Sequence, residues 1–407
     1  MSALARQRKH NHGNNGSRAG NLAMTSSAQV RPDGASFEDN TLFGNVQPLV
    51  DTALLPAGDG QPRVVRAAHR LYEHLISLWA PGAIEAAFDL GVFDELAKGP
   101  ATADELAKSL STNAKATRVL LDGLNAYDLL VRTWDADGTV VYVLPDEVRD
   151  VLRPDGLFSL AGKIGYDRQM AWGAWRNLAE TVRTGALADD GSQQHNQISA
   201  SEYESLVRGI NFWAPPVVHA LSAQLKEHGW AGDKTAGMLD VGCGTGIYSQ
   251  LLLQQFAGLT ATGLDVERIL PLAIAQSEQL DVADRFHPLR RDFWREDWGT
   301  GFDLVLFVNI FHLQTPEDAR DLAIKANKAL ADGGLVAIVD QIVVEDEVQQ
   351  NSTQNRFFRL FAASMMATGG GDAYTLDQYD EWLTGAGLRR VALIDTPMHR
   401  ILLAGRD

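Results

Sequence analysis

The sequence predicts an α/β protein, in which a parallel, doubly wound sheet follows a mostly helical N-terminal domain of the winged-helix type. Apolar runs alternate with segments of helical periodicity at 236–241, 259–264, 285–289, 303–308, 335–340 and 391–404. The first of these runs leads into a loop with glycine at every second position, Gly242, Gly244 and Gly246, and then into a helical stretch. Upstream, helical patterns precede two short alternating segments that flank a turn.

The chain divides into four segments by composition and periodicity. Residues 1–45 are poor in large apolar groups and rich in Asn, Gly and Ser, so we expect a disordered tail. Residues 60–150 form the predicted winged-helix domain. Residues 151–228 read as a helical linker with helices over 156–185 and 199–228, and residues 229–407 carry the sheet.

The N-terminal domain is predicted from its helix signals. One helix is expected over 64–80, ended by Pro81-Gly82, and a second over 83–90. Thr102 and Glu105 form a candidate capping box for a third, and a fourth is expected over 113–130. The segments 129–133 and 139–144 alternate as strands of a hairpin.

Composition restricts the classes of function. The 407 residues carry a net charge of -16, which argues against nucleic acid as a partner. No apolar run reaches the ~18 residues of a membrane span, so we expect no membrane association and a cytoplasmic protein. The one cysteine, Cys243, fits a reducing compartment and is read as a loop residue, not a nucleophile. The ten histidines show no metal-ligand pair at helical spacing, so no metal is expected.

The glycine loop predicts a ligand site. Glycines leave no Cβ in the way, so backbone N–H groups and the helix N-terminus can approach a ligand. Asp240 precedes the loop, where it would repel a pyrophosphate. Asp265 ends the next apolar run and can accept bonds from both hydroxyls of a ribose. Together the two acids favour a cationic nucleoside over a dinucleotide.

These features resemble the class I S-adenosylmethionine (SAM) methyltransferases, whose first motif is an acid followed by G-x-G-x-G. The resemblance rests on Asp240 with the glycine loop and continues in the segments 291–294, 302–309 and 333–340. Upstream, the segments 90–93 and 102–107 are similar to the N-terminal domain of small-molecule O-methyltransferases, a group that includes acetylserotonin, phenazine and polyketide-tailoring enzymes.

The resemblance implies a Rossmann-like domain with SAM as cofactor, over residues 229–407, and a homodimer formed by the winged-helix domain. The cofactor-binding residues it implies are Asp240, Gly242, Gly244, Gly246, Asp265, Asp292, Phe293 and Asn309. Asp292 corresponds to the partner of the adenine amino group, with Phe293 or Trp294 along the ring. His312 stands where the family's His-Asp-Trp motif has its general base, but Leu313 and Gln314 replace the acid and the tryptophan. Asp340 stands where the family often has a glutamate.

The implied reaction is methyl transfer to a small, aromatic secondary metabolite, on a hydroxyl oxygen, as in antibiotic biosynthesis. The linker helices and a later helical segment supply candidate pocket residues, namely Trp172, Phe212, Trp213, Phe361 and Met365. Since aromatic residues at helical spacing are usually core residues, packing is the competing interpretation. The altered motif at His312 leaves open a C- or N-methyltransferase or another SAM-using enzyme of the same fold. A SAM-sensing winged-helix regulator is the alternative from another class.

Overall fold

The computed structural model describes residues 63–185, 200–230, 234–350 and 352–406. The tail predicted at 1–45 lies outside these ranges. None of the helices in the described ranges has the length and apolar character of a membrane span.

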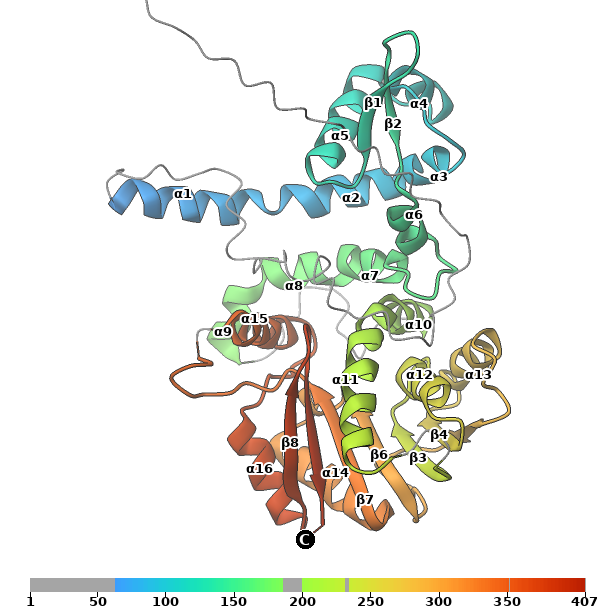
Figure 1. The fold of residues 1–407 in the computed structure, drawn as a ribbon. Helices are drawn as coiled ribbons and strands as arrows, with labels where there is room; N and C mark the ends of the chain where they lie inside the picture. Colours follow the sequence, from blue (N-terminus) through green and yellow to red (C-terminus); the bar gives the residue numbers. More distant parts are fainter. Residues whose placement is uncertain (1–62, 186–199, 231–233, 351, 407) are drawn as a thin grey trace, which may run out of the picture. The chain divides into compact units, whose positions relative to one another are not determined.

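The C-terminal part of the chain is built on a seven-stranded sheet with the order β5-β4-β3-β6-β7-β9-β8 (Figure 1). Its strands are β3 (Ala236–Val241), β4 (Leu259–Asp265), β5 (Phe286–Arg290), β6 (Phe302–Val308), β7 (Leu330–Asp340), β8 (Arg389–Asp395) and β9 (Arg400–Gly405). The first five pair in parallel, and the chain winds outward in both directions from β3 and β6. The predicted doubly wound fold is therefore confirmed, and the carboxyl ends of β3, β4 and β6 meet at one edge.

One strand prediction is wrong. The run 391–404 is two antiparallel strands, β8 and β9, and β9 also runs antiparallel to β7. The chain reverses at Thr396, whose backbone N–H and hydroxyl both donate to the carbonyl of His399, at 2.9 and 2.8 Å. Pro397 lies in this turn and has no N–H for a sheet ladder. The sheet is thus parallel except for one strand.

Helices cover both faces of this sheet (Figure 1). One core contains residues of α11 (Ala214–Glu227), α12 (Ile247–Gln255) and α13 (Leu270–Gln279), and the other contains residues of α14 (Pro316–Ala329) and α16 (Leu376–Gly385). Met238 of β3 enters the first core and Leu239 the second. Because successive side chains of a strand point to opposite faces, a strand buried on both sides is a continuous apolar run, as β6 is from Leu304 to Val308.

The N-terminal domain has its own core, around Phe93, Leu106, Leu121 and Leu124. Its elements are α1 (Arg63–Ile76), α2 (Trp79–Asp89), α3 (Val92–Leu96), α4 (Ala103–Ser109), α5 (Ala114–Ala126), β1 (Val131–Trp134), β2 (Val140–Val143) and α6 (Asp146–Leu152). The predicted capping box is present, because Thr102 accepts the Glu105 N–H and the Glu105 carboxylate accepts the Thr102 N–H. β1 and β2 form the predicted hairpin.

Two helix boundaries in this domain were predicted wrongly. Pro81 and Gly82 do not end a helix but lie inside the first turn of α2, where the N–H groups need no intrahelical partner. The helix expected over 113–130 ends at Ala126, because Asp128 adopts a left-handed conformation with φ of 58°. The second boundary depends on one backbone angle that helical periodicity does not report.

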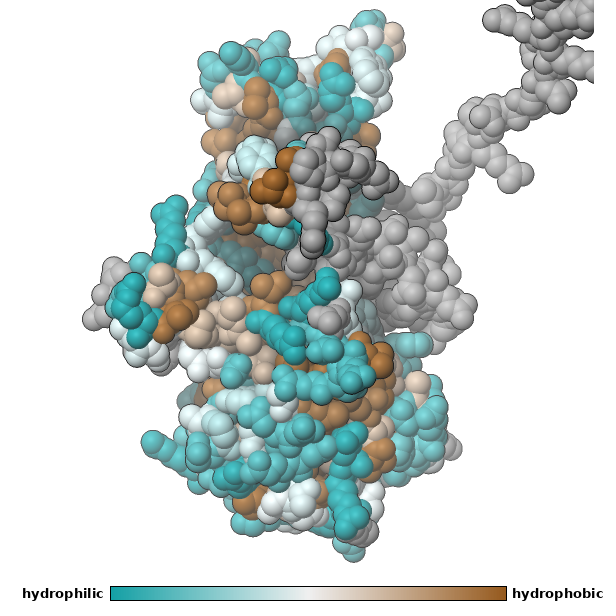
Figure 2. All heavy atoms as spheres, turned by 90° about the vertical axis from the view of Figure 1, so that its left-hand side faces the viewer, coloured by the Kyte–Doolittle hydropathy of each residue, from teal (hydrophilic) through white to brown (hydrophobic). Residues whose placement is uncertain are grey.

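An apolar stripe stays uncovered along α1 and the start of α2. Its members are all at least 49 % exposed: Val64, Leu71, Tyr72, Leu75, Leu78 and Trp79. Brown hydrophobic side chains also gather in places on the face that Figure 2 shows. A contiguous exposed apolar surface of this kind marks an interaction site.

The segment between the two domains is helical but more broken than predicted. The helix expected over 156–185 consists of α7 (Ala161–Tyr166), a π-helical turn η1 (Asp167–Ala171), α8 (Trp172–Arg176) and α9 (Leu178–Thr184). The helix expected over 199–228 consists of α10 (Ala200–Gly209), the 3-10 turn η3 (Asn211–Trp213) and α11. Pro215 and Pro216 explain the second break, since proline is tolerated in a first helical turn but not in a helix interior. The remaining elements are the 3-10 turn η4 (Phe311–Leu313) and α15 (Thr353–Thr368).

Candidate active site

The glycine loop joins β3 to α12, and all three glycines have positive φ, at 68°, 58° and 74° for Gly242, Gly244 and Gly246. A side chain would be strained in this left-handed region. The missing side chains also make room for protein atoms: a Cβ at Gly242 would lie 2.6 Å from Ile310, and one at Gly244 3.0 Å from Val207. The residues after β6 and those of α10 therefore pack directly on the loop.

Several N–H groups of the loop are already used within the protein, contrary to the simple expectation that they face a ligand. Gly242 and Cys243 both donate to the carbonyl of Leu264, at 2.8 and 3.1 Å. Gly244 donates to the carboxylate of Asp265 at 2.9 Å. Cys243 is buried, and burial raises the pKa of its thiol. These bonds fix the loop against the end of β4.

The two acids predicted at the loop have different environments. Asp240 is 2 % exposed and accepts a hydrogen bond from the Ser249 hydroxyl of α12 at 2.6 Å. Burial raises the pKa of Asp240 to about 7. Asp265 accepts from the N–H groups of Gly244 and Val266, and burial raises its pKa as well. Asp240 thus supports the start of α12, whereas Asp265 ends β4 beside the loop.

Asp292, Phe293 and Trp294 form a turn after β5. The Asp292 carboxylate accepts the backbone N–H of Trp294 at 2.9 Å, and the Phe293 ring lies 3.9 Å from the Cβ position at Gly242. Lys325 of α14 donates to the carbonyls of Phe293 and Trp294, at 2.5 and 2.7 Å. The turn is therefore held from α14, and its phenylalanine borders the glycine loop.

His312 lies in η4, after β6, and is 5 % exposed. Its Nδ1 lies 2.7 Å from a carboxylate oxygen of Asp340, and its backbone N–H donates to the other oxygen at 3.1 Å. Burial by itself would raise the pKa of Asp340, but the imidazole and the backbone N–H groups of His312 and Gln341 lower it overall. With Nδ1 bonded to a carboxylate, the ring carries its proton there, and Nε2 remains as the proton acceptor.

Asn309 directly follows β6 and has a left-handed backbone, with φ of 56°. Its N–H donates to the carbonyl of Val339 at 3.0 Å, and its Oδ1 lies 2.8 Å from Nε2 of His399. Asn309 and His312 therefore lie in one short segment, and Ile310 of this segment packs on Gly242.

One cavity of about 1130 Å³ brings many of these residues together. Asn309 and His312 line it, and so do the five predicted pocket residues Trp172, Phe212, Trp213, Phe361 and Met365. The Phe361 ring stands edge-on to the His312 ring, with centroids 5.0 Å apart. Val207, which packs on Gly244, also lines the cavity, so the wall reaches the glycine loop. A cavity with aromatic walls suits a flat organic ligand, and polar lining residues such as Glu85, Lys163 and Asp167 can bond its substituents.

The predicted residues fall into two groups by position. The loop glycines, Asp240, Asp265 and the turn at Asp292 form the rim at the carboxyl ends of β3, β4 and β5, outside the cavity lining. Two residues escaped the sequence reasoning. Lys325 is one of several charged residues on a helix, and His399 is an isolated histidine in a turn, so neither belongs to a recognisable motif. Among the described residues there is no group of three or more histidine, cysteine or acidic side chains placed to hold a metal ion.

Comparison with known proteins identifies two regions of the chain. Residues 72–146 match the family model of the O-methyltransferase dimerisation domain, and residues 239–336 match that of a methyltransferase domain. The chain is similar to a 3-hydroxy-5-methyl-1-naphthoate 3-O-methyltransferase of Streptomyces sahachiroi, 24% identical over 347 residues, which cover 83% of this chain and 94% of that protein. It is 23% identical to an L-tyrosine C(3)-methyltransferase of Streptomyces lavendulae, over 75% of this chain and 82% of that protein.

The fold is also similar to solved structures. Human N-acetylserotonin methyltransferase, solved in complex with SAM, superposes with a TM-score of 0.70 at 20% identity, over 86% of this chain and 99% of that chain. A methyltransferase of calicheamicin biosynthesis, solved with S-adenosylhomocysteine (SAH), gives a TM-score of 0.66 at 22% identity, over 85% and 100% of the two chains.

Proposed function

We propose that this chain, which belongs to the small-molecule O-methyltransferase family of SAM-dependent methyltransferases, methylates a hydroxyl oxygen of a small aromatic secondary metabolite. The observation that carries the proposal is the His312–Asp340 pair, whose imidazole stands in the wall of an aromatic cavity that reaches the glycine loop. Such a pair can take the proton of a hydroxyl group that is placed in the cavity.

The residues around the loop fit an adenosyl cofactor. Asp265 presents a carboxylate at the end of β4, where ribose hydroxyls would donate to it, and the Phe293 ring can lie along an adenine. We assign Asp240, Gly242, Gly244, Gly246, Asp265, Asp292, Phe293 and Asn309 to this site. Within this set, Asp240 and Gly246 stabilise the conformation of the loop. The Ser249 hydroxyl bonds Asp240, and the Gln250 side chain packs against Gly246. SAM supplies an activated methyl group when bound.

His312 acts on the acceptor. Its Nδ1–H is held by Asp340, so the ring has one orientation and one tautomer, and Nε2 can accept a hydroxyl proton. General-base catalysis typically contributes 10²–10⁴ in rate, and holding the reactants in line can supply ~7–11 kcal/mol. The absence of the family's acid and tryptophan after His312 does not remove this function, since Asp340 orients the ring from the neighbouring strand.

The cavity selects the acceptor by shape. Trp172, Phe212, Trp213, Phe361 and Met365 present aromatic and sulfur-containing surfaces that favour a flat, apolar substrate. Its volume of about 1130 Å³ exceeds what a single ring needs, which favours a fused or substituted ring system. The L-tyrosine C(3)-methyltransferase relative favours carbon methylation as the second candidate, in which His312 would orient the acceptor.

The chain forms a homodimer, as its dimerisation-domain match indicates. We infer that the stripe on α1 and α2 lies in the subunit interface, since six exposed apolar side chains follow one another along these two helices. We infer a cytoplasmic enzyme, and its net charge of -16 argues against nucleic acid as a partner. A gel shift with genomic fragments distinguishes the enzyme from a winged-helix regulator, and we expect no shift.

The proposal is tested by incubating the protein with methyl-labelled SAM and a panel of hydroxylated naphthoates, quinones and tyrosine derivatives. The expected result is a labelled product whose methyl group is on oxygen. Gly244→Val is the control, because a branched side chain at φ of 58° and 3.0 Å from Val207 disrupts the loop. Calorimetry should show SAH binding by the wild type that this variant loses. Equal SAH affinity in both proteins would remove the loop from the site.

A further inference from the structure

His399 and Asn309 form a buried polar pair between β9 and β6. His399 has no exposed surface, and its Nε2 lies 2.8 Å from Oδ1 of Asn309. The two residues are 90 positions apart in the chain. No step of the proposed reaction uses His399, so its burial beside a residue of the cavity wall calls for a separate explanation.

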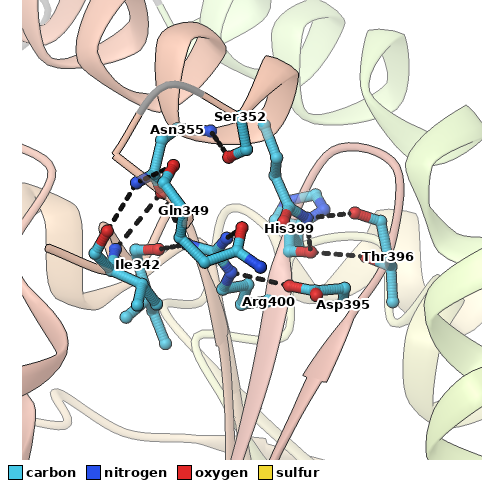
Figure 3. A network of polar contacts seen from close by, with 10 residues as sticks. Ile342, Gln349, Ser352, Asn355, Asp395, Thr396, His399 and Arg400 are labelled. Atoms are coloured by element: carbon cyan, nitrogen blue, oxygen red, sulfur yellow. Dashed lines mark hydrogen bonds and ion pairs between the residues drawn. The ribbon is translucent and has the colours of Figure 1, made fainter. Parts of the chain in front are cut away.

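The backbone of His399 is held firmly. Figure 3 shows the polar network at this turn, in which Thr396 donates to the carbonyl of His399. The Gln354 side chain of α15 donates to the same carbonyl at 3.0 Å. The next residue, Arg400, is itself buried and donates to Asp395 at 2.7 Å and to Asn355 at 2.7 Å. These bonds fix the direction in which the histidine ring leaves the turn.

The ring must donate its proton to Asn309. Burial lowers the pKa of His399 to about 3, despite the nearby Asp340 carboxylate, so the imidazole is neutral and has one N–H. Nδ1 is buried and has no hydrogen-bond partner among the described residues. A buried donor without a partner costs more than an acceptor with a free lone pair, so the proton is on Nε2. Oδ1 of Asn309 is then the acceptor, and the amide Nδ2 turns away from His399.

The amide Nδ2 of Asn309 is consequently left for partners other than His399. Asn309 lines the cavity, and the adjacent Ile310 fills the space at Gly242. Burial raises the pKa of the Tyr248 hydroxyl on α12, and the Asn309 side chain opposes this shift. The amide is therefore close to the helix that follows the loop. A donor with a fixed direction at this place can bond an oxygen of a ligand.

We propose that His399 is a positioning residue that fixes the Asn309 amide so that Nδ2 donates to an oxygen of the cofactor. The inference rests on the proposed function, since it needs an adenosyl cofactor at the loop. Without His399, the amide can rotate or flip, and its donors are no longer directed. A neutral hydrogen bond contributes about 0.5–1.5 kcal/mol, which corresponds to about a two- to tenfold change in affinity.

The test measures SAH affinity by calorimetry, without any turnover. His399→Leu removes the donor, and we expect its SAH affinity to be about three- to tenfold weaker. His399→Gln carries an amide N–H at nearly the position of Nε2, and we expect its affinity within about twofold of wild type. Asn309→Gly removes the amide without strain, because glycine adopts φ of 56° readily. In the Asn309→Gly protein, adding His399→Leu should change nothing further.

The outcomes separate positioning from mere support of the fold. Thermal unfolding of each variant, with and without SAH, checks that the affinity refers to folded protein. Wild-type affinity in His399→Leu would overturn the inference, as would equal losses in His399→Leu and His399→Gln. Additive losses in the double variant would also overturn it, since they would show that His399 acts elsewhere than on Asn309. If the wild type itself does not bind SAH, the proposed function fails first.

Discussion

Replacing Asp340 by asparagine tests the proposed chemistry at its most specific point. Asp340 is fully buried at the end of β7 and bonds His312 twice, through Nδ1 at 2.7 Å and through the backbone N–H at 3.1 Å. Asparagine keeps the shape but removes the charge. One oxygen can still accept, while its NH₂ group lies where the second acceptor was. If that oxygen accepts Nδ1–H of the imidazole, the bond is no longer to a charged group, and the NH₂ group faces the backbone N–H of His312.

The expected loss follows from these contacts. A hydrogen bond to a charged group contributes about 1.5–3 kcal/mol, and each ~1.36 kcal/mol of transition-state stabilisation corresponds to tenfold in rate. Asp340→Asn should therefore lower kcat by about 10- to 150-fold. SAH affinity should stay within about twofold, because the carboxylate contacts His312 and Gln341 and no residue of the glycine loop.

The assay is single-turnover methyl transfer at saturating SAM. A kcat within threefold of wild type, with chemistry rate-limiting, would refute the orienting function of Asp340. The matched control is Asp303→Asn, which removes an acid that bonds the N–H of Gly237 at the opposite end of β3.

Three further predictions concern the base, the loop acid and the dimer. His312→Ala should keep SAM affinity but lower kcat by about 10²–10⁴, and a loss below about tenfold would favour an orienting function and a carbon or nitrogen acceptor. Burial raises the folded-state pKa of Asp240 to about 7, above its unfolded value of ~3.9, so its contribution to stability is complete below ~3.9 and is lost as pH rises through about 7. The free energy of unfolding by urea should therefore fall in the wild type, relative to Asp240→Asn, by about 1.4 kcal/mol for each pH unit from pH 5 to 7. The same dependence of this free energy on pH in both proteins would contradict the prediction. Light scattering should give twice the 44.3 kDa monomer mass, and replacing Leu71 and Leu75 by glutamate should halve it, whereas a wild-type monomer at micromolar concentration would exclude the interface.

Hydrophobic periodicity and glycine spacing predict the strands of the sheet well, because each strand is recognised from the residues of its own short segment. β3 begins and ends where the apolar run does, and β6 and β7 are apolar on both faces because helices cover both. The wrong element boundaries lie where the backbone conformation of one or two residues ends a helix or a strand. Asp128 ends α5 by adopting positive φ, and Pro397 reverses a run that looks like one strand. Neither the end of α5 nor the turn at Pro397 changes the hydrophobic pattern of the sequence, so this pattern predicts neither.

The sequence predicts those residues of the candidate site that belong to motifs, but not their hydrogen-bond partners. The loop, Asp265 and His312 each follow an apolar strand, so their common edge follows from the fold. The partners of these residues come from distant segments. The local sequence predicts neither the bond between Asp340 and His312 nor that between His399 and Asn309. Both pairs depend on the register between strands that are far apart in the chain.

The single cysteine of the chain gives this protein a practical property. Cys243 is buried in the glycine loop, and its thiol is held in the protonated form, which does not react with maleimides or iodoacetamides at neutral pH. A cysteine introduced at an exposed position, such as Val348 at 83 % exposure or Val391 at 47 %, would therefore be the one site of labelling. Pairs of fluorophores or spin labels can be attached without first removing a native thiol. Reaction of Cys243 itself would then report that the loop has opened.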